Sequence, residues 1–192
     1  MKETRMRLSK WMTIGLLVLA TGCTAVTQRT SVNVGYYNVG GASFSELDRQ
    51  IALHGPQVPG VGRAIAATSV RMTPSIRFGP VNGACRVTSA RVRVQANVTL
   101  PRFADRNAAT KKLKGAIDNI EAYARLHEAV HVSIADKFAE GAEKEIAALP
   151  PAPDCDILRE RITVTYNRIM KEHEAAQLEF DAQEQQRFAQ RS

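Results

Sequence analysis

The sequence predicts an α+β fold rather than a wound parallel sheet, because its strands precede its two long helices instead of alternating with them. Apolar and polar residues alternate from Cys85 to Leu100, which is typical of a strand with one buried face. From about Asn107 the apolar spacing becomes helical, and a proline-rich segment at 150–153 divides this region in two. A length of 192 residues with 44% hydrophobic residues suits one globular domain.

The first 22 residues have the features of a secretory signal peptide. A basic head at 2–10 precedes an almost wholly apolar run at 11–20, which is too short to span a bilayer as a stable helix. The next residues complete Ala20-Thr21-Gly22-Cys23, which resembles a bacterial lipobox and implies cleavage before Cys23 with lipidation of its thiol. Ordinary signal cleavage nearby is the alternative, and both export the chain.

Export sets the expected domain limits and location. We expect a signal peptide at 1–22, a lipidated N-terminus with a polar tether at 23–34, and a folded domain at 35–192. Thr24 is not the Asp that commonly retains lipoproteins at the inner membrane. We therefore expect the chain on the periplasmic face of the cell envelope, anchored by lipid in the outer membrane.

The charge balance argues against a nucleic-acid partner. The full chain carries a formal net charge of +7, and removing the signal peptide lowers it to +4. The dense basic cluster of Lys111, Lys112 and Lys114 has no interleaved aromatic residues and is expected to be a solvated helix face.

The first half of the domain predicts strands and one short helix. A short strand at 36–39 ends at Gly40-Gly41, and Ser43 with Glu46 has the spacing of a capping box for a helix at about 43–53, which Gly55-Pro56 ends. Residues 64–78 alternate loosely, and turn signals at 79–84 predict an antiparallel pair with the strand that follows. The expected buried face of that second strand comprises Ala90, Val92, Val94, Ala96, Val98 and Leu100.

The second half predicts a helical hairpin. One helical pattern runs from about Asn107 to Leu149 and another from Leu158 to Phe180. Cys85 and Cys155 are the cysteines that remain once Cys23 is lipidated, and in an exported chain they are expected to form one disulfide.

A His-Glu-x-x-His motif lies in the first of these helices. His127 and His131 are four residues apart and project from one helix face, where two imidazoles can bind one Zn²⁺. Glu128 is then placed to act as general base on a water activated by the metal. The neighbours Leu126 and Val130 are uncharged, as expected for a buried helix. The alternative is a helix with two solvated or core histidines.

Hairpin geometry offers a candidate for the third zinc ligand, and position on the same helix stripe offers one for an oxyanion stabiliser. If the turn centres on Pro151, His173 faces the motif histidines and is the expected third ligand. A solvated His173 is the alternative, and Tyr166 on the same stripe is a possible oxyanion stabiliser. The reserve ligands are Glu172, Gln177 and Glu184.

The chain resembles the bacterial domain-of-unknown-function family 922, commonly described as predicted secreted zinc-dependent proteases. The resemblance covers about residues 35–185 and rests on the stretches 36–41, 85–89 and 99–102, the motif at 127–131, Leu47, Gly55-Pro56, Cys155 and Phe180-Asp181. It implies an exported, zincin-like metalloprotease domain and pairs Cys85 with Cys155.

Two departures from the family pattern concern the site. Val130 stands where the family often has Gly, and residues 184–187 lack the histidine of the Thr-x-His-Gly segment that follows the family's Asp. If that histidine is a ligand, His173 or Glu184 can replace it, or the site is weakened.

The sequence thus predicts a zinc metallopeptidase that hydrolyses peptide or protein substrates. The alternative is a non-catalytic envelope lipoprotein, whose structural or degenerate metal site serves a binding or scaffold module.

Overall fold

The computed structural model describes residues 29–59 and 62–190, and every described helix and strand lies between Thr30 and Ala189. The predicted signal peptide and the lipobox ending at Cys23 lie outside these residues. Among the described helices, none is both long and apolar enough to cross a membrane. The fold is α+β, as the sequence predicts.

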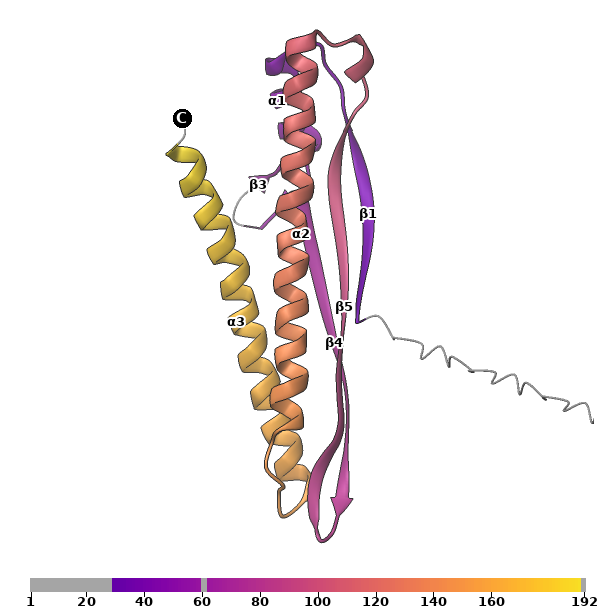
Figure 1. Cartoon of the computed structure of the whole chain (residues 1–192), viewed down its shortest axis with the longest axis vertical. Helices are drawn as coiled ribbons and strands as arrows, with labels where there is room; N and C mark the ends of the chain where they lie inside the picture. Colours follow the sequence, from indigo (N-terminus) through magenta and orange to yellow (C-terminus); the bar gives the residue numbers. More distant parts are fainter. Residues whose placement is uncertain (1–28, 60–61, 191–192) are drawn as a thin grey trace, which may run out of the picture.

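A three-stranded sheet forms one layer of the molecule (Figure 1). Its strands are β1 (Thr30–Val39), β4 (Ala67–Val81) and β5 (Ala84–Phe103), with β5 in the middle. β4 and β5 are antiparallel, as expected, whereas β1 runs parallel to β5 and makes the sheet mixed. β1 begins inside the expected tether, because residues 30–34 already pair with residues 94–98 of β5.

Local chemistry explains the hairpin between β4 and β5. Asn82 and Gly83 form its two-residue turn and both have positive φ, of 51° and 79°, which this residue pair tolerates well. The alternation in β5 is confirmed, because all six apolar residues expected on its inner face are buried.

The short helix α1 (Phe44–His54) begins as the capping pattern predicts. The Ser43 side chain accepts from the Glu46 amide at 3.3 Å, and the Glu46 carboxylate accepts from the Ala42 amide at 2.7 Å. A small antiparallel pair, β2 (Gln57–Val58) and β3 (Gly62–Arg63), follows it, and the 3₁₀ turn η1 (Arg106–Ala108) links β5 to the long helices.

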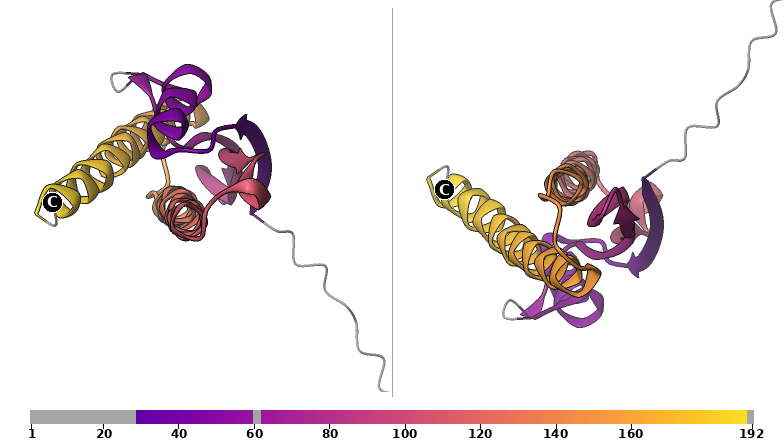
Figure 2. Two further views of the ribbon diagram at one scale, coloured as in Figure 1. Left: turned by 90° about the horizontal axis from the view of Figure 1, so that it is seen from above. Right: turned by 90° about the horizontal axis from the view of Figure 1, so that it is seen from below.

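The predicted helical hairpin consists of α2 (Lys111–Ala147) and α3 (Cys155–Ala189), which both lie to one side of the sheet (Figure 2). α2 faces β5 with a row of buried alanines, whose small side chains allow a close approach: Ala124, Ala135, Ala139 and Ala142. The expectation that Leu126 and Val130 are buried is wrong, because they are 70% and 39% exposed and point away from the sheet.

The start of α3 is fixed to the start of β5. The predicted disulfide joins Cys85 to Cys155, and Cys85 also forms an isolated bridge with Ala152 through backbone hydrogen bonds of 2.8 and 2.9 Å. The connection between the helices therefore runs down to the sheet before α3 begins, which sets the height of α3 against α2.

Candidate metal centre

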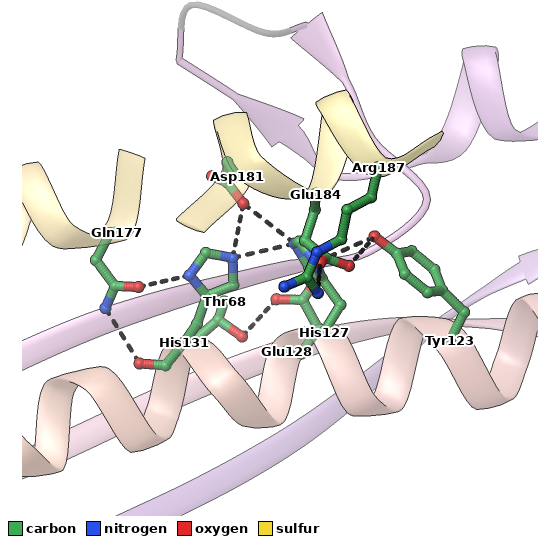
Figure 3. Close-up of polar contacts among 9 residues, drawn as sticks. All are labelled: Thr68, Tyr123, His127, Glu128, His131, Gln177, Asp181, Glu184 and Arg187. Atoms are coloured by element: carbon green, nitrogen blue, oxygen red, sulfur yellow. Dashed lines mark hydrogen bonds and ion pairs between the residues drawn. The ribbon is translucent and has the colours of Figure 1, made fainter. Parts of the chain in front are cut away.

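His127 and His131 on α2 meet Asp181 on α3 in one group of three ligand atoms (Figure 3). The histidines are four positions apart, so both rings leave the same face of α2. The two Nε2 atoms lie 3.1 Å apart, and Asp181 Oδ1 lies 3.2 Å from that of His127 and 3.0 Å from that of His131. Three groups that can bind a metal thus converge on one point.

The spacing of these atoms fits a tetrahedral zinc site. Zinc bonds to imidazole nitrogen and carboxylate oxygen are about 2.0–2.2 Å long, which places neighbouring ligand atoms of a tetrahedron about 3.3–3.6 Å apart. The three distances in the group, 3.0, 3.1 and 3.2 Å, are slightly shorter than this range, so a small outward movement of the side chains would admit the ion. Two histidines and one carboxylate are also a ligand set that catalytic zinc sites use.

Gln177 determines which nitrogen of His131 faces the group. Its Oε1 atom can only accept, so the contact of 2.5 Å with His131 Nδ1 places the ring proton on Nδ1. Its amide nitrogen donates to the His131 carbonyl at 3.1 Å and to His173 Nε2 at 2.8 Å. Burial lowers the pKa of His173, which favours the neutral ring that this contact requires.

A second chain of contacts orients His127. Its Nδ1 atom lies 3.2 Å from the Tyr123 hydroxyl, which donates to the Glu184 carboxylate at 3.5 Å, and Arg187 donates to the other oxygen of Glu184 at 2.7 Å. Burial and the Glu184 charge raise the pKa of Tyr123 to about 12, so its hydroxyl keeps its proton. His127 Nδ1 is then the donor to the Tyr123 oxygen, and its Nε2 carries the lone pair.

With both Nδ1 atoms held by these hydrogen bonds, three atoms with lone pairs face one another: the two Nε2 atoms and Asp181 Oδ1. Such an arrangement is repulsive unless a positive charge lies among them. Either a proton or a metal ion can supply it, but only a metal ion uses all three atoms at once. Hydrogen bonds to the outer nitrogens of the imidazoles are also what metal-binding histidines almost always have.

Phe180 packs against both histidine rings. Its ring centroid lies 4.8 Å from that of His127 and 5.0 Å from that of His131. Because Phe180 directly precedes Asp181 on α3, the same turn of helix supplies a candidate ligand and an aromatic contact to both rings.

The motif glutamate points from α2 toward the sheet. Glu128 is only 3% exposed and is the one fully buried charged residue in the described part of the chain. The Thr68 hydroxyl on β4 donates to its Oε2 atom at 2.6 Å. A buried carboxylate with this single side-chain partner retains acceptor capacity for a further donor, such as a water molecule.

A cleft of about 530 Å³ opens over this group. It lies between the edge strand β4 and the two helices, and its walls include the motif side chains, Asp181 and the apolar residues Val58, Ala66, Val70, Met170 and Phe188. The volume falls within the usual range of ligand sites, and the cleft gives a substrate access to both Glu128 and the ligand group.

The family match agrees with the resemblance. Residues 34–188 match a family described as "Bacterial protein of unknown function". The chain belongs to the DUF922 family. The matched range contains the whole candidate centre, from Thr68 to Arg187. No curated protein and no solved structure matches the chain.

Two of the residues selected from the sequence lie outside the ligand group of the DUF922 chain. His173 lines the cleft but contacts Gln177 and the Phe138 ring, and Asp181 takes the third position in the group. Tyr166 donates to the Met72 carbonyl at 3.2 Å and does not line the cleft. Fifteen residues separate it from Asp181, or about 22 Å along a helix.

The register of the hairpin explains both differences. His127 with Asp181, and His131 with Gln177, are each equidistant from residue 154 rather than from the expected centre at Pro151. Ala152 and Cys155 are both bound to Cys85, so the chain continues past the end of α2 before α3 begins. Each residue of α2 therefore faces a residue of α3 about six positions later than a turn centred on Pro151 would give. Helical periodicity gives the face of a residue but not this offset.

Asp181, Tyr123 and Thr68 were not predicted as site residues from the sequence. One signal was present on α3, where the polar residues His173, Gln177, Asp181 and Glu184 recur every three or four positions and therefore share a face. Two of the reserve ligands, Gln177 and Glu184, belong to the outer contacts of the group, whereas Glu172 pairs with Arg168 on the surface. Thr68 lies on another element, and no local pattern marks it.

Proposed function

We propose that this DUF922 chain is an exported zinc-dependent metallopeptidase of the cell envelope. The observation that carries the proposal is the group of His127, His131 and Asp181 beside the buried carboxylate of Glu128, at the base of a cleft. The three ligands would hold Zn²⁺, with Asp181 in the position expected of His173. Three protein ligands leave one position for water or substrate, which distinguishes catalytic from structural zinc sites.

The residues of the chain have separable roles in this proposal. A bound Zn²⁺ supplies a Lewis acid that polarises a peptide carbonyl and lowers the pKa of water to about 7. Glu128 accepts a proton from the attacking water and returns it to the leaving amine. Thr68 holds the Glu128 carboxylate in position, and Gln177 and Tyr123 hold the two imidazoles.

The location proposed for the enzyme comes from the sequence. A signal peptide at 1–22 would export the chain, and lipidation of Cys23 would tether it to the membrane. Its substrates would then be peptides or proteins of the envelope.

The test is the variant Glu128→Gln, produced as residues 24–192, which include every described element. With a mixture of unstructured peptides as the probe and mass spectrometry as the readout, we expect cleavage to fall at least about 100-fold while zinc content stays near one per chain. The matched control is Glu160→Gln, an exposed carboxylate on α3 with no ion pair among the described residues. Full cleavage by Glu128→Gln would overturn the proposal.

The second candidate is a non-catalytic lipoprotein with a structural metal. It is favoured by the burial of Glu128 and its hydrogen bond to Thr68, which a purely structural carboxylate would also have. Zinc bound by the wild-type chain without cleavage of any peptide in the mixture would support this candidate instead.

A further inference from the structure

The outer face of the sheet carries only positive charge. The strands β1, β4 and β5 contain six arginines and no Asp, Glu or Lys. By contrast, 14 of the 19 acidic residues of the chain lie in α2 and α3. The three strands therefore carry charge of one sign, whereas α2 and α3 carry both signs, with 14 acidic and 11 basic residues.

Strand register gathers five of these arginines on the face that points away from α2 and α3. Arg91 and Arg93 alternate with the buried residues of β5, and Arg71 and Arg77 of β4 pair with Gln95 and Ser89 on the same outer face. All five are exposed: Arg71, Arg77, Arg86, Arg91 and Arg93. We call this surface the arginine face.

Few acidic side chains neutralise the arginines of this face. Among the described residues, Arg71, Arg77, Arg86 and Arg93 have no ion-pair partner, and Arg91, at 76% side-chain exposure, is 3.9 Å from Glu143. The neighbouring outward residues are neutral and polar, such as Thr73, Ser75 and Gln95. From Arg86 to Arg93 the row is about 24 Å long. This is an extended surface for phosphate groups, which guanidinium groups bind well.

The beginning of β1 lies beside this face. Thr30 pairs with Val94, the residue after Arg93. Cys23 is seven residues before Thr30, and an extended chain spans at most about 3.5 Å per residue, so a lipid on Cys23 would lie within about 25 Å of Thr30. A membrane holding that lipid would be close enough for the arginine face to reach it.

We propose that the arginine face docks on an anionic phospholipid surface. The cleft is lined by Thr68 and Val70, which alternate with Arg71 and so face the other side of the sheet. Docking would therefore direct the cleft away from the membrane, toward substrates in solution. A basic surface is the kind of second attachment that complements a lipid anchor.

The test is the binding of unlipidated residues 24–192 to phosphatidylcholine vesicles with and without phosphatidylglycerol. We expect binding to the anionic vesicles only, weakened by added salt. Neutralising four arginines should weaken it at least about tenfold. The variant is R71Q/R77Q/R86Q/R93Q.

Matched variants separate the arginine face from net charge and from folding. A variant that neutralises four exposed basic residues on α2 and α3 has the same change in net charge and should bind as the wild type does. A variant that changes the four arginines of the face to lysine should retain binding. The control is K112Q/K137Q/R161Q/K171Q. Equal losses in both glutamine variants, or no preference for anionic vesicles, would overturn the proposal.

Binding to a soluble polyanion tests whether the partner is an acidic polypeptide instead of a membrane. If polyglutamate binds through the same arginines while vesicles do not, the partner is an acidic polypeptide and membrane docking is wrong. These readouts need neither zinc nor hydrolysis, so their failure is distinct from failure of the proposed function.

Discussion

At the scale of single residues, Asp181 and His173 are the two candidates for the third zinc ligand. Only Asp181 lies in the ligand group, because the hairpin register brings it to the two motif histidines. We expect Asp181→Asn to weaken zinc binding by about 100-fold or more, since the charge of a ligand is lost. His173→Phe should weaken it far less, because His173 contacts the group only through Gln177. Zinc titration of the two variants measures the difference, and the reverse order would restore His173 as the third ligand.

Gln177 should act on the metal without binding it. Gln177→Leu removes the acceptor of the His131 Nδ1 proton, so either ring nitrogen can then carry that proton. We expect a loss of about 10–100-fold in zinc affinity with little change in thermal stability of the zinc-free chain. Gln183→Leu is the matched control, because Gln183 is exposed on the same helix and, among the described residues, its side chain hydrogen-bonds to Glu179 alone. Unchanged affinity in Gln177→Leu would show that the ring needs no such support.

At the scale of elements, the disulfide determines where α3 begins. It closes a loop with a sequence separation of 70 residues, for which the chain-entropy relation gives a stabilisation of about 4 kcal/mol. Changing Cys85 and Cys155 to Ser should lower the free energy of unfolding by about 2–4 kcal/mol, measured by urea denaturation. The wild type should lose the same amount in reductant, and the double variant should not respond to it. Equal stability of both proteins would leave the backbone bridge to Ala152 as the sufficient link.

The sequence predicted most elements and their faces for local reasons. Ser43 with Glu46, the Asn82-Gly83 turn and the alternation in β5 each act over a few residues, and the structure agrees with them. The parallel pairing of β1 with β5 was not predicted, because it joins residues more than 60 positions apart and no local pattern encodes it. Leu126 and Val130 were wrongly expected to be buried for a similar reason, since an apolar side chain does not show which face a partner covers.

At the scale of the whole molecule, zinc should hold the far half of α3 to α2. The buried residues of α3, Leu158, Ile162 and Ile169, all precede residue 170, so the later part makes its contacts through half-buried side chains of the candidate centre. Zinc at about 100 times its Kd should add about 2.7 kcal/mol of stability, or about 5–10 °C in Tm. Amide exchange should slow mainly in residues 170–189. The variant His127→Ala should show neither effect, and a zinc-independent Tm in the wild type would contradict the coupling.

The sequence by itself determined which chemistry is available and which side of each element carries it. His127, Glu128 and His131 occupy adjoining positions on one helix, and helical periodicity alone directs both imidazoles the same way. Only the tertiary structure decided which residue completes the group, because that depends on the height of α3 relative to α2. The height is set by Cys85, which holds Ala152 and Cys155 at the start of β5 and so brings Asp181, rather than His173, to the motif.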